Sequence, residues 1–149
     1  MKKILAVASI GGHWVQLLRI AKGLEASYEV LYMSTHDKCA TMVEGHSFYK
    51  LADFSRWDAY KIIPAFFSAM KTVRKAKPDV VITTGAAPGM IVLFAAFCIG
   101  KRTIWVDSIA NVNHLSLCGR IAKRFASRFY TQWAELESKG VIFAGNVIG

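Results

Sequence analysis

Short apolar runs alternate with longer stretches of helical periodicity along this chain. Strands are predicted at residues 3–9, 28–34, 47–51, 79–83, 101–106, 128–131 and 140–143. Helices are predicted at 13–26, 62–76 and 116–126, with a further apolar helix that follows a turn at 84–89 and runs through residue 99. Parallel sheets have strands that are apolar on both faces and are joined by crossover helices. The pattern therefore predicts an α/β fold: a Rossmann-like parallel sheet with helices on both faces.

The composition of the chain limits the classes of protein to which it can belong. Its 149 residues are 54% hydrophobic and 19% charged, which excludes disorder and suits one domain over residues 1–149. The longest apolar stretch, residues 90–99, is shorter than the about 20 residues that span a bilayer, and residues 1–9 lack a leader pattern, so we expect neither a span nor a leader. The net charge of +9 beside this hydrophobicity indicates an anionic membrane surface or a face for another subunit.

Two glycine-containing loops follow predicted strands, at residues 9–13 and 84–89. Doubly wound sheets bind ligands beyond the carboxyl ends of their strands, where helix N-termini offer free N–H groups to an anion. Neither loop has GxGxxG spacing and no acidic residue ends the second strand, which disfavours a dinucleotide site. His13 follows two glycines and either deprotonates a hydroxyl as a general base or caps and packs the helix start.

Four segments, taken together, resemble one family: residues 10–13, 78–89, 105–108 with 115–120, and 128–136. They are similar to the membrane-anchoring subunit family of UDP-N-acetylglucosamine transferase, known from lipid-linked oligosaccharide assembly and from bacterial capsule and exopolysaccharide synthesis. Such proteins look like the N-terminal half of a GT-B glycosyltransferase whose other half is a separate polypeptide. The length agrees with this resemblance, because a complete GT-B enzyme needs two Rossmann-like domains.

The resemblance also implies an acceptor cleft and its residues. It assigns His13 as general base and, for the acceptor and its phosphates, Gly11, Gly12, Gly85, Ala86, Asp107 and Ser108. Asp107-Ser108 stands where many relatives have Glu-Ser, so an acid is kept with a shorter reach. The resemblance implies no metal and no cofactor, and the UDP-sugar donor is expected to be supplied by the partner subunit.

Aromatic and basic residues alternate between positions 54 and 77. A peripheral membrane segment needs this combination, although an ordinary amphipathic helix with its aromatic face in the core has the same periodicity. The candidate membrane residues are Phe54, Trp57, Phe66, Phe67, Lys71, Arg74 and Lys75. A second basic cluster, Arg120, Lys123, Arg124 and Arg128, is expected either near the mouth of the cleft or on a solvated face.

The C-terminal stretch carries much apolar material close to the chain end, where chains usually fray. Trp133 and Phe143 are its large aromatic residues, apart from Phe129 and Tyr130 in the strand before it. We interpret Trp133 and Phe143 as a partner interface, although a closing edge strand explains part of the pattern.

These observations favour a subunit of a split glycosyltransferase that binds a polyprenyl-diphosphate-linked glycan and recruits a separately encoded, donor-binding subunit. Sugar transfer from a UDP-sugar would take place on the cytoplasmic, inner face of the cell membrane, and cysteines without paired spacing suit that reducing compartment. A non-catalytic membrane scaffold is the main alternative, and a nucleotide-dependent oxidoreductase is a further one. Nucleic acid binding is disfavoured because the basic residues are dispersed and no binding motif is present.

Overall fold

The computed structural model describes residues 1–51 and 59–148, and these residues form one seven-stranded parallel sheet. Its strands are β1 (Lys3–Ala8), β2 (Glu29–Ser34), β3 (Phe48–Lys50), β4 (Val80–Thr83), β5 (Arg102–Val106), β6 (Arg128–Thr131) and β7 (Ile142–Phe143). Its α-helices are α1 (Gly12–Ala21), α2 (Ile62–Ala76), α3 (Ala86–Cys98) and α4 (Leu117–Ala122), and short 3-10 turns are η1 (Lys22–Leu24), η2 (Asp37–Met42), η3 (Ala59–Lys61) and η4 (Ala134–Leu136). The strand order is β3-β2-β1-β4-β5-β6-β7, which reverses direction between β1 and β4.

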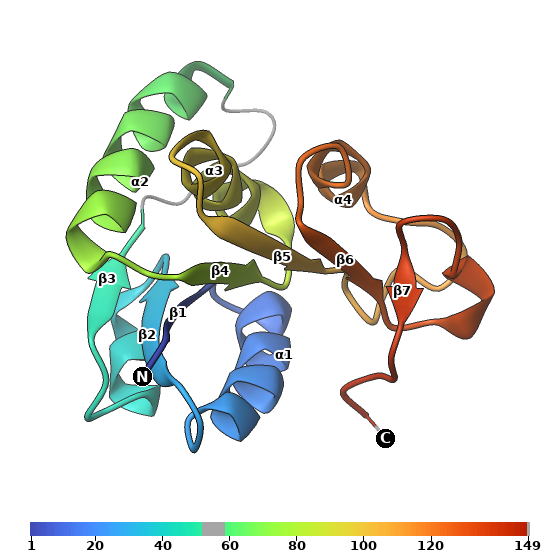
Figure 1. The fold of residues 1–149 in the computed structure, drawn as a ribbon, viewed down its shortest axis with the longest axis horizontal. Coiled ribbons are helices and arrows are strands. Elements are labelled where there is room, and N and C mark those ends of the chain that lie inside the picture. Colours follow the sequence, from blue (N-terminus) through green and yellow to red (C-terminus); the bar gives the residue numbers. More distant parts are fainter. Residues whose placement is uncertain (52–58, 149) are drawn as a thin grey trace.

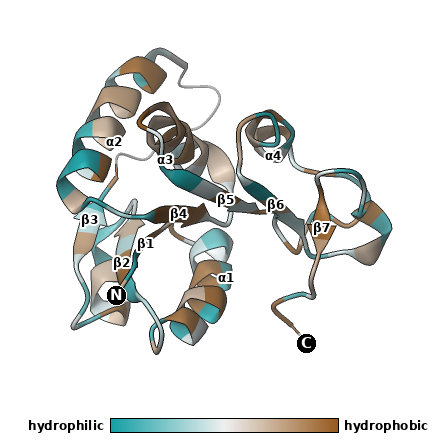
Figure 2. Ribbon diagram, viewed as in Figure 1, coloured by the Kyte–Doolittle hydropathy of each residue, from teal (hydrophilic) through white to brown (hydrophobic). Residues whose placement is uncertain are grey.

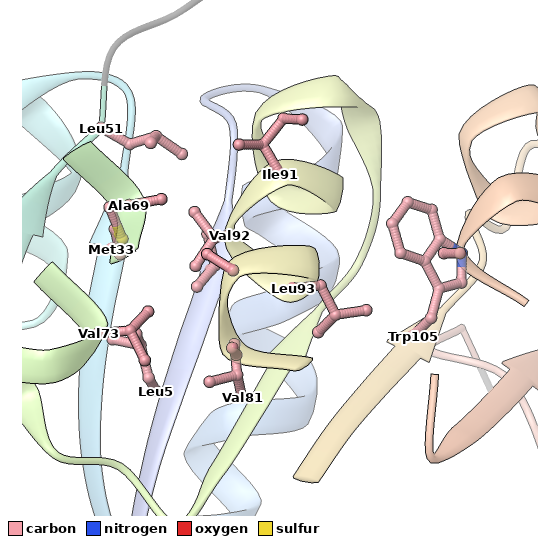
Figure 3. Packing of buried hydrophobic residues seen from close by; sticks show 14 of the residues in the cluster. Leu5, Met33, Leu51, Ala69, Val73, Val81, Ile91, Val92, Leu93 and Trp105 are labelled. Atoms are coloured by element: carbon pink, nitrogen blue, oxygen red, sulfur yellow. The ribbon is translucent and has the colours of Figure 1, made fainter. Parts of the chain in front are cut away.

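Helices cover both faces of the sheet, as predicted. Figure 1 shows α2, α3 and α4 on one face and α1 on the other. Alternate side chains of β1 supply the two cores: Leu5 joins the cluster with α2 and α3, whereas Ile4 joins the cluster with α1. In Figure 3, Val73 of α2 and Val92 of α3 lie in the same cluster as Leu5 and Val81. This two-sided burial explains why the central strands β1 and β4 are mostly apolar on both faces.

Helix α3 is apolar on nearly every side because it lies between α2 and α4 and over the strands. Figure 2 shows α3 and β4 as strongly hydrophobic elements. The predicted turn at 84–89 is wrong in its second half, since α3 begins at Ala86. Pro88 falls in the first helical turn, where its missing N–H is not needed. A Cβ at Gly89 would lie 2.3 Å from Thr83 Oγ1, so this glycine lets α3 approach β4.

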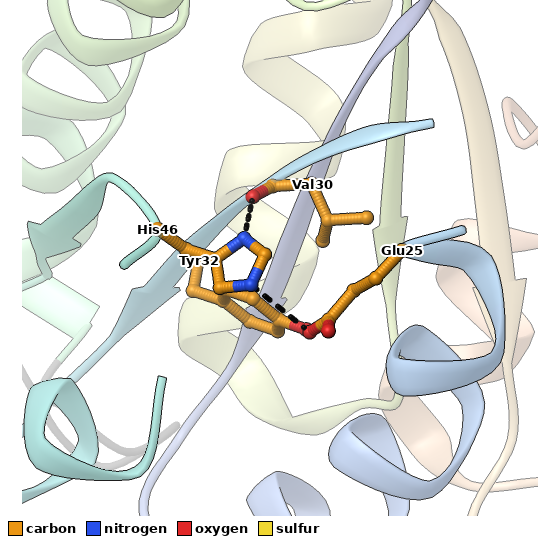
Figure 4. A network of polar contacts seen from close by, with 4 residues as sticks. All are labelled: Glu25, Val30, Tyr32 and His46. Carbon is orange, nitrogen blue, oxygen red and sulfur yellow. Dashed lines mark hydrogen bonds and ion pairs between the residues drawn. The ribbon is translucent and has the colours of Figure 1, made fainter. Parts of the chain in front are cut away.

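A polar network lies within the core on the α1 face (Figure 4). The hydroxyl of buried Tyr32 donates a hydrogen bond to Glu25 Oε1, and His46 Nε2 lies 3.4 Å from the same oxygen. His46 Nδ1 lies 3.0 Å from the Val30 carbonyl oxygen and donates to it, because a carbonyl can only accept. Burial, reinforced by the hydrogen bond to Glu25, raises the pKa of the Tyr32 phenol well above its ordinary value.

Replacing Tyr32 by Phe should reduce the loss of stability at alkaline pH. Since the folded-state pKa exceeds the unfolded value of about 10, the neutral phenol stabilises the fold fully below pH about 10, and this contribution is lost as the pH rises further. Thermal melts between about pH 8 and 11 should therefore show a smaller decline for Tyr32→Phe than for wild type. Tyr28→Phe controls for loss of a surface phenol, and parallel declines in all three proteins would contradict the raised pKa.

Candidate functional site

A cleft of about 430 Å³ opens at the carboxyl ends of β1, β4 and β5. It is lined by Ser9, His13, Thr84, Gly85, Ala86, Ala87, Pro88, Asp107, Ser108, Ala110, Asn111, Ser116, Leu117 and Cys118. The cleft spans the β1–β4 reversal of strand order, which is where doubly wound sheets bind their ligands. The structure thus brings together five of the residues assigned from the sequence: His13, Gly85, Ala86, Asp107 and Ser108.

His13 stands in the first turn of α1, with its imidazole against the loop after β4. Its Nδ1 lies 3.1 Å from the Thr84 carbonyl oxygen, which can only accept a hydrogen bond. A neutral ring therefore carries its proton on Nδ1, and Nε2 is left as the acceptor. The Thr84 hydroxyl donates to the His13 carbonyl oxygen at 2.6 Å and joins the two loops a second time. This is the tautomer and support that a general base requires.

Glycine is required at position 85 for two separate reasons. Its φ of +126° lies in a region that residues with a side chain rarely adopt. A Cβ there would also lie 3.0 Å from both Cε1 and Nδ1 of His13. The next residue, Ala86, has a φ of +68°, which is strained for alanine. The backbone beside the imidazole is therefore held in a conformation that the surrounding fold imposes.

Gly11 and Gly12 are placed differently from the other assigned residues. Both are exposed at the start of α1, and neither is among the described residues that line the cleft, whereas Ser9 is. Gly11 has a φ of +107° and permits the sharp entry into α1. A Cβ at Gly12 would contact nothing within 4 Å. The loop glycines therefore position His13 without forming the cleft wall.

Asp107 directs its hydrogen bonds inward. The side chain is 1% exposed, and its Oδ1 accepts from Trp105 Nε1 at 3.0 Å and from the Ser116 hydroxyl at 2.6 Å. Its Oδ2 accepts from the Ser116 backbone N–H at 3.0 Å. Ser116 in turn caps α4 by accepting from the Gly119 N–H at 2.9 Å. In this structure the carboxylate anchors the start of α4 to the end of β5.

Gly119 is the residue that makes room for the Asp107 anchor. A Cβ there would lie 2.7 Å from Asp107 Oδ1 and from Ser116 Oγ, and 3.1 Å from Trp105 Nε1. Trp105, Ser116 and Gly119 were not assigned to the site from the sequence. A serine at the start of a helix is a capping signal, but nothing local links Ser116 to Asp107.

Ser108 is buried at the cleft, and its hydroxyl contacts Gln16, which in turn contacts Gln132; the sequence did not indicate either glutamine. Its Oγ accepts from Gln16 Nε2 at 3.1 Å and from the Ala110 N–H at 3.2 Å. Gln132 Nε2 donates to Gln16 Oε1 at 2.8 Å. Both glutamines are buried, at 8% and 2% exposed. They connect α1 and β6 with the loop after β5.

The residues assigned to a partner interface lie beyond the cleft. Trp133 is half-buried, and its Nε1 donates to the Ile109 carbonyl oxygen at 2.7 Å. Phe143 is half-buried on β7, which pairs with β6 at the edge of the sheet. Part of this apolar material is therefore a closing edge strand, which is the alternative that the sequence left open.

An aromatic patch crosses α2, α3 and the turn after α4, and we define it as Phe66, Phe67, Phe94, Phe97 and Phe125. Neighbouring rings lie 5.2 to 6.3 Å apart between centroids. Phe67 and Phe97 are 63% and 47% exposed, whereas Phe66 is half-buried against Phe94. Of the other candidate membrane residues, Lys71, Arg74 and Lys75 are exposed on α2, and Phe54 and Trp57 lie outside the described residues.

The second basic cluster does not line the cleft within the described ranges. Arg128, for example, begins β6, so it lies at the amino ends of the strands, away from the cleft at their carboxyl ends.

Two further expectations concern membrane spans and metal sites. None of the helices in residues 1–51 and 59–148 has both the length and the hydrophobicity that crossing a bilayer requires. In the same ranges, His, Cys, Asp and Glu side chains do not gather in threes as a metal site would need.

Comparison with known proteins places the chain in a family. Residues 56–146 match the family described as "Oligosaccharide biosynthesis protein Alg14 like". The chain belongs to this family. A Yarrowia lipolytica relative, UDP-N-acetylglucosamine transferase subunit ALG14, is 41% identical over 81 residues, which cover 50% of this chain and 38% of the relative. The predicted resemblance to a UDP-N-acetylglucosamine transferase subunit is thus confirmed for the Alg14-like family, whereas its extension to bacterial capsule and exopolysaccharide proteins stays a prediction.

Solved structures confirm the fold class of this Alg14-like chain. MurG from Acinetobacter baumannii, a GT-B glycosyltransferase, matches with a TM-score of 0.80 and 18% identity over 96% of this chain and 45% of MurG. A UDP-GlcNAc 2-epimerase from Neisseria meningitidis bound to UDP-GlcNAc matches with a TM-score of 0.74 and 14% identity, over 98% of this chain and 47% of the epimerase. In all three comparisons the matched region is less than half of the other protein.

Proposed function

We propose that this chain is the acceptor-side subunit of a heteromeric UDP-N-acetylglucosamine transferase that extends a lipid-linked oligosaccharide. A second, separately encoded subunit would bind the UDP-sugar. The observation that carries the proposal is that an Alg14-like chain folds as a Rossmann-like unit with a cleft at the switch point of its sheet. The name of the Yarrowia lipolytica relative, a transferase subunit, supports the same division.

The cleft suits the activation of an acceptor hydroxyl. In the proposed reaction the hydroxyl oxygen of the acceptor attacks the anomeric carbon of the UDP-sugar, a new C–O bond forms, and UDP leaves with the electrons of the broken bond. His13 Nε2 would take the hydroxyl proton, because its Nδ1 is already committed to Thr84. The N-terminus of α3 and Ser108 border the same cleft and would favour the diphosphate of a polyprenyl-linked acceptor.

We assign the aromatic patch to an anionic membrane surface. Exposed rings on α2 and α3 would enter the interface, while Lys71, Arg74 and Lys75 would contact acidic headgroups at about 1 kcal/mol each. Of these two helices, α3 also borders the cleft, because Ala86 at its start lines it. A lipid-linked acceptor could then reach His13 without leaving the bilayer surface.

Replacing both Phe67 and Phe97 by Glu should lower binding to phosphatidylglycerol vesicles about tenfold or more, because two apolar contacts are lost and two negative charges face an anionic surface. Vesicle flotation measures the bound fraction. Val15→Glu is a matched control, because Val15 is 48% exposed on α1, on the opposite face of the sheet. Equal loss of vesicle binding in the control, or undiminished flotation of the double variant, would contradict the assignment of the aromatic patch to the membrane surface.

We assign the second subunit to the surface around the C-terminal segment. A groove of about 400 Å³ lies between α1, the sheet and residues 144–147, and its lining includes Ile82, Ile104 and Tyr130. Trp133 and Phe143, both half-buried, lie nearby in sequence. An apolar groove of this size beside half-buried aromatic residues suits the docking of another subunit.

Reconstitution of transfer tests the proposed function. The chain and its candidate partner, the product of a neighbouring gene, are purified separately and mixed on vesicles that contain a polyprenyl-diphosphate-linked acceptor. Labelled sugar should move from UDP-N-acetylglucosamine to the lipid only when both subunits are present. Transfer by either subunit alone at the rate of the mixture would contradict the split-enzyme proposal.

A further inference from the structure

Two buried glutamines join four segments of the chain behind the cleft. Gln16 lies on α1, one turn after His13, and Gln132 follows β6. Gln132 Nε2 donates to Gln16 Oε1 at 2.8 Å and to the Asp107 carbonyl oxygen at 2.9 Å. Its Oε1 accepts from the Val147 N–H at 3.0 Å. The two amides therefore hold α1, the loop after β5 and the C-terminal segment in one arrangement.

The network determines which atom of the Gln16 amide, the oxygen or the nitrogen, faces Ser108. Gln16 Oε1 lies 3.1 Å from the Ile109 backbone nitrogen, which can only donate a hydrogen bond. The oxygen of Gln16 must therefore face Ile109, and its nitrogen must face Ser108. The contacts of Gln132 are consistent with this orientation, because its side-chain nitrogen donates both to Gln16 Oε1 and to the Asp107 carbonyl oxygen.

This orientation determines what the Ser108 hydroxyl offers. A hydroxyl has two lone pairs and one proton. Gln16 Nε2 and the Ala110 N–H, at 3.1 and 3.2 Å, occupy the two lone pairs. The proton is then the remaining hydrogen-bonding capacity of Ser108, a residue that lines the cleft. Ser108 is thereby restricted to donating, and a donor recognises an oxygen that accepts, such as a phosphate oxygen.

We infer that Gln16 is a positioning residue that restricts Ser108 to donating a hydrogen bond to a phosphate oxygen of the diphosphate-linked acceptor. The inference rests on the proposed function, because it names the contact by which the acceptor-side cleft selects its ligand. Gln132 and the Ile109 N–H hold Gln16 in the orientation that this requires.

Two substitutions at Gln16 separate hydrogen-bond polarity from mere packing. Gln16→Glu keeps the size and the acceptor oxygen but turns the donor toward Ser108 into an acceptor, so that Ser108 donates inward. Gln16→Met removes every side-chain hydrogen bond of Gln16 but leaves the Ser108 proton free. The affinity of the full chain for farnesyl diphosphate, measured by titration calorimetry, should fall about tenfold for Gln16→Glu and less for Gln16→Met. A purely structural role predicts the reverse ranking, because methionine loses more hydrogen bonds.

Lower pH should restore the glutamate variant. Protonation of the introduced carboxyl returns an O–H donor to position 16. The affinity of Gln16→Glu relative to wild type should therefore recover as the pH is lowered, and the ratio to wild type at each pH removes effects common to both proteins. No recovery in a folded variant would overturn the inference.

Ser108→Ala provides a test that does not depend on whether the variants at position 16 fold. It should weaken farnesyl diphosphate binding about tenfold by itself, and adding Gln16→Glu should then cause no further loss. Unchanged affinity in Ser108→Ala, or additive losses in the double variant, would overturn the positioning role while the proposed function stands. If the wild-type chain fails to bind farnesyl diphosphate, the acceptor-side proposal fails and the inference fails with it.

Discussion

Replacing His13 by Ala is expected to lower kcat for sugar transfer in the assembled complex by about 10²–10⁴-fold, the usual contribution of a positioned general base. The imidazole Nε2 is placed to accept a hydroxyl proton, because Nδ1 donates to the Thr84 carbonyl oxygen. The loop geometry should survive, since the Thr84 hydroxyl bonds to the backbone carbonyl of residue 13, which alanine retains. Steady-state transfer with both subunits on vesicles measures the effect.

The controls for this variant decide between chemistry and scaffolding. Val15→Ala, at an exposed position two residues along α1, should leave turnover unchanged. Binding of His13→Ala to the partner and to vesicles should equal that of wild type. If His13→Ala then transfers sugar at the wild-type rate, the residue only packs the start of α1, and the chain recruits a transferase without taking part in its chemistry.

Asp107→Ala is expected to lower the free energy of unfolding by about 3 to 5 kcal/mol. The substitution leaves the Trp105 indole N–H and the backbone and hydroxyl groups of Ser116 without the carboxylate that they share. Trp105 is fully buried at the junction of β5 and α4, so its indole N–H is the donor that loses its acceptor at the greatest cost. Urea denaturation of both proteins, followed by far-UV circular dichroism, gives the difference.

Asp37 offers the matched control for this stability change. Its carboxylate is exposed and pairs with Lys50 at 3.4 Å, so Asp37→Ala should change the free energy of unfolding by about 0.5 kcal/mol or less. Similar effects of the two alanine variants would contradict the anchoring role of Asp107. So would an Asp107→Ala protein of wild-type stability that has lost acceptor binding, because the carboxylate would then face the ligand.

The fold was predictable where burial and local sequence agree. The predicted bounds of α2, 62–76, match the observed Ile62–Ala76, because Pro78 disfavours helical backbone at Lys77. Helix α4 ends at Ala122 and not at 126, and α1 tightens into a 3-10 turn at Lys22. Helix ends depend on tertiary packing and on single hydrogen bonds, which periodicity does not record.

The site was predictable in part for a topological reason. Parallel strands bring their carboxyl ends to one edge, so His13, Gly85 and Ser108 meet although they are far apart in sequence. Gln16 could not be assigned in the same way, because its partners Ser108 and Gln132 lie 92 and 116 residues away. A polar residue on the buried side of an amphipathic helix was the one local sign of its role.

Ligand binding by the isolated chain tests most directly whether this subunit binds the acceptor and the second subunit binds the UDP-sugar. Titration calorimetry compares UDP-N-acetylglucosamine with a short-chain polyprenyl diphosphate on the same preparation. The account predicts that the lipid diphosphate binds in the cleft and that His13→Ala retains this binding, while the UDP-sugar gives no measurable heat until the partner subunit is added. Tight binding of UDP-N-acetylglucosamine to the chain alone would contradict the account, because the donor site would then lie in this half of the enzyme.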